Sequence, residues 1–179
     1  YFGGWPVNPN KDKIQSPSLV GDCKSDLKEV LCPCSSNEDC KSGKCFSSPR
    51  AGQYCLPGPG TIFPQFKLMD QFGEEVDLYD FAGHGKLIVI EMSTAWCAPC
   101  QQLAEWLIDN DLSITEHKWW KKEYNIIREL INDQKIFFIN IQVQDSYRTP
   151  SSLESLEDWY NRYPDEHIPL LADSDYSVR

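Results

Sequence analysis

Three features are absent or scarce in this chain, and each limits the functions that it can have. No apolar run approaches the roughly 20 residues that a membrane-spanning helix needs. Positive charge is scarce: 17 Lys and Arg stand against 27 Asp and Glu, and this net charge of −10 argues against a nucleic-acid partner. Histidine is rare too. His84, His117 and His167 are scattered without metal-ligand spacing, so we interpret them as ordinary surface or loop residues.

The length and the start of the chain set the scale of the fold. With 179 residues, 41% of them hydrophobic, the chain can form one good-sized domain, or one domain with a small module. It begins at Tyr1 with neither a methionine nor a signal-like apolar segment. We therefore expect a mature chain whose leader has been removed.

Cysteine, by contrast, is abundant. Six of the eight cysteines crowd into the first third of the chain, which is rich in Pro and Gly and has almost no apolar periodicity. Such a segment cannot offset its ordering entropy by burial, so we expect three disulfides worth roughly 2–4 kcal/mol each. Cys32 and Cys34 are too close in sequence to pair comfortably with each other, and the pairing is otherwise open. The predicted structural disulfides use Cys23, Cys32, Cys34, Cys40, Cys45 and Cys55.

A zinc site is the alternative for these cysteines, because short Cys spacings can ligate metal. No histidine precedes His84, and paired Cys-x2-Cys knuckles are missing from the segment, so we expect neither a metal nor a cofactor. The run from Cys34 to Cys55 resembles short cysteine-rich modules of secreted and cell-surface proteins. This resemblance implies an oxidising location (secreted, periplasmic or cell-surface) and a role in attachment.

The other two cysteines lie in Trp96-Cys97-Ala98-Pro99-Cys100. Before them, an apolar run over 86–93 predicts a buried strand. After them, apolar residues at i, i+3 and i+4 from Leu103 predict a helix over 101–108. A strand, a Cys-x-x-Cys and a helix in this order place the first cysteine at a helix N-terminus, where a small disulfide can open and close. The pattern predicts a redox pair.

The residues from Thr61 onward alternate between strand and helix patterns. Further strands are predicted over 61–69, 76–81, 136–143 and 167–172, with a turn at 70–73. A helix over 122–133 has the apolar face Ile126, Ile127, Leu130 and Ile131. A third helix opens at a capping box of Ser151 and Glu154, with the buried stripe Leu153, Leu156, Tyr160 and Tyr163. We therefore predict an α/β domain with a parallel sheet over 61–179, preceded by a disulfide-rich module over 1–60.

Several of these segments resemble one known group. Phe63 to Leu68, Val76 to Gly83, the Cys-x-x-Cys with its strand, and Ile168-Pro-Leu-Leu-Ala-Asp173 resemble the thioredoxin-like redoxin group. This group contains membrane-anchored or secreted thiol–disulfide oxidoreductases and the alkyl hydroperoxide reductase/thiol-specific antioxidant proteins. The resemblance covers about residues 61–179 and implies a thioredoxin-like fold.

The resemblance also implies a dithiol mechanism. Cys97 attacks a disulfide of a partner protein, and Cys100 then resolves the mixed disulfide. Trp96, Ala98 and Pro99 form the substrate-binding surface, in which Trp96 is a flat docking surface and Pro99 holds the turn. The predicted function is reduction or exchange of protein disulfides outside the cytoplasm.

Glu91 interrupts the apolar run six positions before Cys97. Thioredoxins carry a buried aspartate at the matching position, which moves protons to the second cysteine, so the resemblance implies that Glu91 serves Cys100 as a proton acceptor. Buried carboxylates without partners are costly and cluster at active sites. The alternative is a strand-edge glutamate that faces solvent or pairs with a lysine.

Two other functions stay open. A thiol peroxidase carries Pro-x-x-x-Thr/Ser-x-x-Cys: Thr94 fits this motif, but Ile90 stands where the proline should be. The third reading is a non-catalytic extracellular structural or assembly protein in which Cys97–Cys100 is a static bridge.

The resembling fold needs more chain than is present. After the strand near Ile168, a complete domain continues through a helix, a cis-proline strand, a partner strand and a final helix. We therefore expect the C-terminal part to be missing, with another chain or an assembly as one candidate for completing it. Pro169 is a candidate for the cis-proline, although Leu171 to Asp175 resembles the loop that precedes the missing helix.

Overall fold

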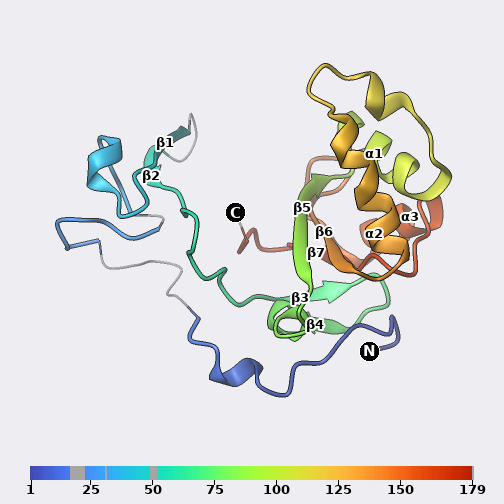
Figure 1. Cartoon of the computed structure of the whole chain (residues 1–179), viewed down its shortest axis with the longest axis horizontal. Coiled ribbons are helices and arrows are strands. Elements are labelled where there is room, and N and C mark those ends of the chain that lie inside the picture. Colours follow the sequence, from blue (N-terminus) through green and yellow to red (C-terminus); the bar gives the residue numbers. More distant parts are fainter. Residues whose placement is uncertain (17–22, 31, 49–51, 179) are drawn as a thin grey trace. The chain divides into compact units, whose positions relative to one another are not determined.

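The computed structural model describes residues 1–16, 23–30, 32–48 and 52–178 (Figure 1). Its contacts divide the chain into two units, Tyr1–Lys11 with Phe66–Arg179, and Asp12–Gln65. The sequence groups residues 1–60 together, whereas in the structure Tyr1–Lys11 packs with the larger unit. Among the described residues, no helix combines the length and the apolar character needed to cross a bilayer.

The larger unit is built on a five-stranded sheet in the order β4-β3-β7-β6-β5. The strands are β3 (Lys67–Asp70), β4 (Glu75–Asp77), β5 (Leu87–Thr94), β6 (Ile136–Gln144) and β7 (Leu170–Ala172). β5, β6 and β7 run parallel, whereas β3 pairs antiparallel with both β4 and β7. The sheet is thus mixed rather than parallel as predicted, because the tight turn between β3 and β4 allows only an antiparallel pair. This mixed α/β architecture is consistent with the predicted thioredoxin-like fold.

The helices α1 (Ala98–Asp109), α2 (Ile126–Asn132) and α3 (Leu153–Arg162) gather on one side of the sheet (Figure 1). Trp106 and Leu107 of α1 pack with Phe138 of β6, while α3 packs on β7. The opposite face of the sheet has no α-helix among the described residues. There, Ile139, Ile141 and Leu171 pack against Trp5 of the N-terminal segment, Phe66, and Leu78 and Phe81 of a short 3-10 helix.

The predicted end of one strand and the predicted start of one helix are wrong, because in each case a side chain other than the expected one caps the backbone. The strand expected over 76–81 stops at Asp77, whose carboxylate accepts the N–H of Tyr79 at 2.9 Å and starts the 3-10 helix η3 (Leu78–Phe81). The third helix is capped by Ser152 in a box with Ser155, not by Ser151 with Glu154. The hydroxyl of Ser151 donates instead to the carbonyl of Gln142 on β6.

Two predicted apolar faces also need correction. The helix expected over 122–133 is a 3-10 turn, η5 (Lys122–Asn125), followed by α2, and the side chain of Ile126 is 54% exposed. On α3, Leu153 is 39% exposed and Trp159 is buried instead. The connection between α1 and α2 contains one more 3-10 helix, η4 (Ser113–Glu116). The Ile168–Pro169 peptide bond is trans.

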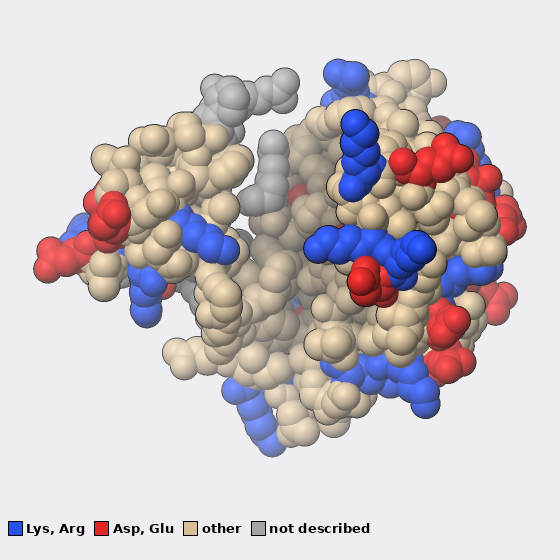
Figure 2. Space-filling model, turned by 45° about the horizontal axis from the view of Figure 1, so that its top comes forward, with Lys and Arg blue, Asp and Glu red and all other residues tan. Residues whose placement is uncertain are grey.

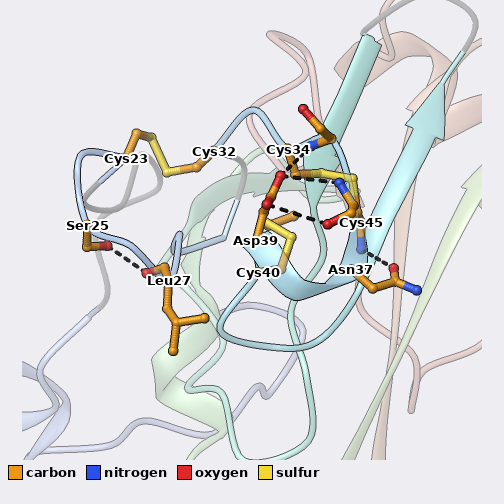
Figure 3. Close-up of a disulfide and its surroundings, with 12 residues drawn as sticks. Cys23, Ser25, Leu27, Cys32, Cys34, Asn37, Asp39, Cys40 and Cys45 are labelled. Carbon is orange, nitrogen blue, oxygen red and sulfur yellow. Dashed lines mark hydrogen bonds between the residues drawn. A yellow bond between two sulfur atoms is a disulfide. The ribbon is translucent and has the colours of Figure 1, made fainter.

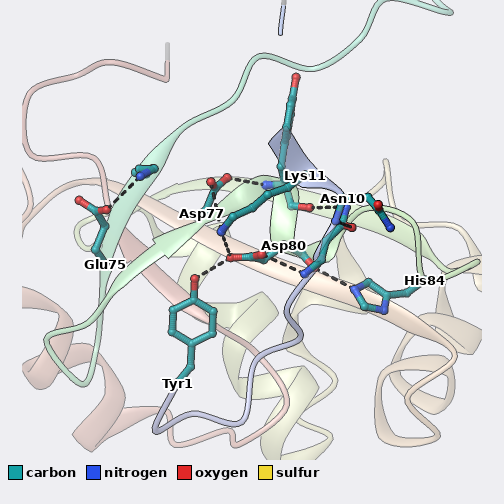
Figure 4. Close-up of polar contacts among 10 residues, drawn as sticks. Tyr1, Asn10, Lys11, Glu75, Asp77, Asp80 and His84 are labelled. Carbon is teal, nitrogen blue, oxygen red and sulfur yellow. Dashed lines mark hydrogen bonds and ion pairs between the residues drawn. The ribbon is translucent and has the colours of Figure 1, made fainter. Parts of the chain in front are cut away.

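The first residues of the chain are bound to the larger unit through the carboxylate of Asp80 (Figure 4). This carboxylate accepts hydrogen bonds from the Tyr1 hydroxyl at 2.6 Å and from the Asn8 backbone N–H at 2.9 Å. Lys11 Nζ lies 2.7 Å from it and 3.5 Å from Asp77. Burial alone raises the pKa of Asp80, but the hydrogen bonds from Lys11, Tyr1 and Asn8 outweigh it and hold this pKa below its usual value. Asp80 is thus a fully paired buried charge.

The smaller unit contains the hairpin of β1 (Cys45–Ser48) and β2 (Gly52–Cys55) and the short 3-10 helix η2 (Asn37–Asp39). Another short 3-10 helix, η1 (Lys11–Lys13), spans the point where the chain passes from the larger to the smaller unit. The six cysteines form the pairs Cys23–Cys32, Cys34–Cys45 and Cys40–Cys55. Cys32 and Cys34 are therefore not joined to each other, as expected. Figure 3 shows Asp39 beside these bridges, where its carboxylate accepts the N–H groups of Ser35 and Ser36.

Candidate active site

Cys97 lies at the junction between β5 and α1 and caps the first turn of the helix. Its Sγ accepts a hydrogen bond from the backbone N–H of Cys100 at 3.3 Å. Pro99 lies in the first turn, where its missing N–H leaves no intrahelical bond unmade. The N–H of Cys100 and the dipole at this end of α1 favour a thiolate on Cys97 once the pair is reduced.

The pair is closed as a disulfide in a turn held by the backbone. Cys97 and Cys100 are bonded, and their Cα atoms are 5.3 Å apart. The N–H of Cys97 donates to the carbonyl of Thr94 at 3.0 Å. Both cysteines are partly exposed, and Ala98 and Pro99 between them are exposed. Another thiol can therefore approach this disulfide from solvent.

Glu91 projects from β5 into a small cavity between the sheet and the helices. The cavity leaves about 30 Å³ open to a water-sized sphere, which is room for one or two waters. Burial raises the pKa of Glu91 to about 7, and the hydrogen bond from Asn140 lowers it only in part. The walls are mostly apolar and comprise Ala104, Leu107, Ile108, Phe138, Asn140, Trp159, Tyr160, Tyr163, Asp165, Ile168 and Leu170.

Asn140 is the neighbour of Glu91 on the adjacent strand. The two residues face each other in the parallel pairing of β5 with β6, and Asn140 Nδ2 donates to Glu91 Oε2 at 2.9 Å. The other end of the amide, Oδ1, accepts from the Ser93 hydroxyl at 2.5 Å. In the part of the chain that the structure describes, no Lys or Arg forms an ion pair with Glu91. The carboxyl group thus has one amide donor and no opposing charge.

Cys100 faces the same layer as Glu91. Cys100, Ala104 and Ile108 recur every four residues on α1 and pack together against α3 and β7. Ala104 and Ile108 also line the cavity of Glu91. The second cysteine and the carboxyl group of Glu91 therefore border one apolar layer.

Trp96 lies beside the pair and is 43% exposed. Its Nε1–H donates to Gln144 Oε1 at 3.1 Å, and the guanidinium carbon of Arg148 lies 4.5 Å from the centre of its rings. The indole is thus held along one edge and over one face, while part of it stays open to solvent.

The sequence predicts one site from Cys97, Cys100, Glu91, Trp96, Ala98 and Pro99. In the structure Trp96 to Cys100 lie at the β5–α1 junction, whereas Glu91 lies within β5. The sequence does not point to Asn140, Gln144 or Arg148 as residues of the site. For Asn140 a signal existed, because it interrupts the apolar run 136–143 as Glu91 interrupts 86–93. Gln144 and Arg148 lie at a strand end and in a loop, where no periodicity marks them.

Neither the histidines nor the other cysteines suggest a metal centre. His84 Nε2 lies 2.9 Å from the carbonyl of Asp80, and His117 Nε2 lies 2.7 Å from Gln102 Oε1. Among the described residues, one group brings potential ligand atoms within 4.8 Å of each other, namely Cys34, Cys40 and Cys45. All three sulfurs are already bonded in disulfides.

Comparisons with known proteins add little to this geometry. No protein-family model matches the chain, and no curated protein matches it. The solved structure of MTB dsbF in its mixed oxidized and reduced forms is similar to 64% of this chain, with 19% identity and a TM-score of 0.41. The similarity covers 65% of the length of that protein. The four cysteine pairs at bonding distance are compatible with an oxidising compartment.

Proposed function

We propose that this chain is a thioredoxin-like thiol–disulfide oxidoreductase that reduces or exchanges disulfides of partner proteins through Cys97 and Cys100. The observation that carries the proposal is the position of Cys97 at the first turn of α1, bonded to Cys100 and open to solvent. A helix N-terminus lowers a thiol pKa from about 8.5 toward neutrality, so the attacking sulfur is a thiolate under ordinary conditions.

The reaction runs in two exchanges. The Cys97 thiolate attacks one sulfur of the substrate disulfide, a Cys97–substrate disulfide forms, and the other substrate sulfur leaves as a thiolate and takes a proton. Cys100 then loses its proton and attacks Cys97, which closes the Cys97–Cys100 disulfide and releases the second substrate thiol. Two electrons pass from the pair to the substrate, and an external dithiol restores the pair.

Glu91 accepts the proton of Cys100 in the second exchange. A carboxyl group with a pKa of about 7 is partly ionised at neutral pH, so it can take a proton and release it again. The shared apolar layer of Glu91 and Cys100 supports this role.

Turnover with a peptide disulfide tests the proposal. The protein is supplied with a dithiol reductant and a synthetic peptide with one disulfide, and new peptide thiols are counted with a thiol-reactive dye. We expect catalysis that Cys97→Ser abolishes. Cys100→Ser should instead accumulate the mixed disulfide, visible by mass. A wild-type rate equal to the uncatalysed rate would refute the proposal.

The same preparation discriminates the alternatives. Peroxide consumption that depends on Cys97 would favour a thiol peroxidase, although Ile90, at the position of the motif proline, lies within β5. A reduction potential below about −300 mV would favour a static structural bridge.

Two further expectations belong to this proposal. The three disulfides of the smaller unit support a secreted, periplasmic or cell-surface location and an attachment role for that unit.

In the described sheet β5 pairs only with β6, and its Leu87 and Met92 are 74% and 43% exposed. An open, apolar edge supports the expectation that a further polypeptide segment completes the domain. Figure 2 shows acidic and basic residues interspersed on the face in view, so this face offers no field of one sign to a partner.

A further inference from the structure

The loop between β6 and α3 is tightly constructed around one aspartate. Asp145 Oδ1 accepts the N–H groups of Tyr147 and Thr149 at 2.9 and 2.8 Å, and its Oδ2 accepts the Thr149 hydroxyl at 2.6 Å. The backbone closes the same loop, since Asp145 N–H donates to the Thr149 carbonyl at 2.9 Å. An exposed loop with this many internal hydrogen bonds has a defined conformation.

Arg148 adopts a backbone conformation that this loop imposes. Its φ is +65°, in the left-handed region that glycine adopts easily and arginine rarely does. Such a conformation persists where surrounding contacts enforce it, and it is a reason to ask what the side chain does.

The side chain of Arg148 lies on Trp96, the residue before Cys97. Its guanidinium carbon is 4.5 Å from the ring centre, and its backbone carbonyl accepts from Gln144 Nε2 at 3.2 Å. Gln144 Oε1 in turn accepts the indole N–H of Trp96, and Gln144 Nε2 also donates to the Tyr176 hydroxyl at 3.2 Å. Arg148 of the loop therefore holds the face of the indole, and Gln144 at the end of β6 holds its edge.

We propose that Arg148, with Gln144, is a positioning residue that fixes Trp96 as the surface on which the substrate peptide docks before Cys97 attacks it. The inference rests on the proposed function. An exposed indole that is free to rotate loses rotamer entropy when a substrate docks, whereas a held indole has lost it already. Arg148 thus acts through Trp96 on substrate binding, and not on the sulfur.

Arg162 provides a matched control. Its guanidinium carbon lies 5.1 Å from the ring centre of Tyr163, so it is also an arginine stacked on an aromatic ring, at the end of α3. Removing it takes away a similar contact from Tyr163, which lines the cavity of Glu91, so Arg162→Ala reports what the loss of a stacked arginine alone does to turnover.

The test compares peptide turnover with alkylation of reduced Cys97 by iodoacetamide, a reagent too small to need a docking surface. We expect Arg148→Ala to raise KM for the disulfide peptide about two- to tenfold, with kcat and the alkylation rate unchanged. Arg148→Lys keeps the charge without the planar stack, so its KM should lie between those of the wild type and Arg148→Ala. Arg162→Ala should leave all three quantities unchanged. In a Trp96→Ala background, which has a raised KM of its own, Arg148→Ala should add nothing.

Each other outcome has a distinct meaning. An unchanged KM in Arg148→Ala, or an additive effect in the Trp96→Ala background, would overturn the positioning role alone. A slower alkylation at unchanged KM would also overturn it, because Arg148 would then act on the thiolate. Equal losses in Arg148→Ala and Arg162→Ala would reduce the effect to general stability. A wild-type protein that does not turn over the peptide would refute the proposed function and the docking role together.

Discussion

Asp80 and Glu91, two carboxyl groups of the larger unit, have opposite surroundings. Asp80 has a lysine and two hydrogen-bond donors on its carboxylate, and its pKa is held below the usual value. Glu91 has one amide donor in a mostly apolar cavity, and its pKa is raised to about 7. One group is therefore kept charged, while the other is poised to gain or lose a proton.

The difference separates a structural carboxylate from one that fits the proposed proton transfer. A buried charge that is fully paired holds chain segments together, and here Asp80 joins the first residues of the chain to η3. A buried acid without a counter-charge contributes nothing comparable to the fold at neutral pH. Its position in the apolar layer that Cys100 also borders fits the proposed proton transfer.

The largest expected effect is on stability, at Asp80. Asp80→Asn removes the charge that pairs with Lys11, and we expect the free energy of unfolding at pH 7 to fall by about 4 kcal/mol in urea denaturation. Glu75→Gln is the control, because its partner Lys67 is 3.5 Å away and both are exposed, so the loss should stay within about 1 kcal/mol. Similar losses of unfolding free energy in the two variants would contradict a structural role for the charge of Asp80.

The pH dependence of stability should have opposite signs at the two sites. Glu91 has a folded pKa of about 7 against an ordinary value of 4.5, so the folded state binds the proton more tightly. Stability linked to Glu91 is then fully present below pH 4.5 and is lost as the pH rises to about 7, by roughly 3 kcal/mol in total. Stability linked to Asp80 is present above 3.8 and is lost as the pH falls below that value. Urea midpoints of wild type and Glu91→Gln between pH 4 and 8 should diverge with rising pH. A constant difference between the two midpoints over this pH range would contradict the raised pKa of Glu91.

The rate effect at Glu91 is next in size. Glu91→Gln keeps the shape of the side chain but cannot accept a proton, and we expect peptide turnover at pH 7 to fall about 100-fold, or roughly 2.7 kcal/mol. The loss should lie in the second exchange, so the mixed disulfide should accumulate on a quenched gel. Asp80→Asn is the matched carboxylate control and should keep the wild-type rate per folded molecule. An unimpaired Glu91→Gln enzyme would remove the proposed role.

The smallest effect concerns the N-terminal segment. Trp5 is 7% exposed in the core, and its Nε1–H donates to Asp70 Oδ2 at 2.8 Å. Trp5→Phe keeps most of the packing and loses this bond, so we expect a loss of about 1–2 kcal/mol by thermal or urea unfolding. Trp119→Phe, at a half-exposed position, should have little effect. Equal effects would argue against Tyr1–Lys11 as part of the larger unit.

The sequence predicts the parts of this account that depend on neighbouring residues. The strand, Cys-x-x-Cys and helix follow from periodicity and spacing, and Glu91 is visible because it interrupts an apolar run. The paired state of Asp80 is not visible, because its partners Tyr1 and Lys11 are far away in sequence and lie in a segment that composition assigns to the cysteine-rich module. The contact of Arg148 with Trp96 cannot be predicted from the sequence either, because Arg148 lies in a polar loop without periodicity.

The pKa of Glu91 is the most direct test of the central claim, that this carboxyl group is held ready for proton transfer. It can be measured by NMR from the side-chain carboxyl carbon in the oxidised protein, in which neither Cys97 nor Cys100 titrates. Glu91→Gln identifies the resonance by its disappearance. The account predicts a midpoint near pH 7. A midpoint near 4.5 would show a solvated glutamate and contradict it.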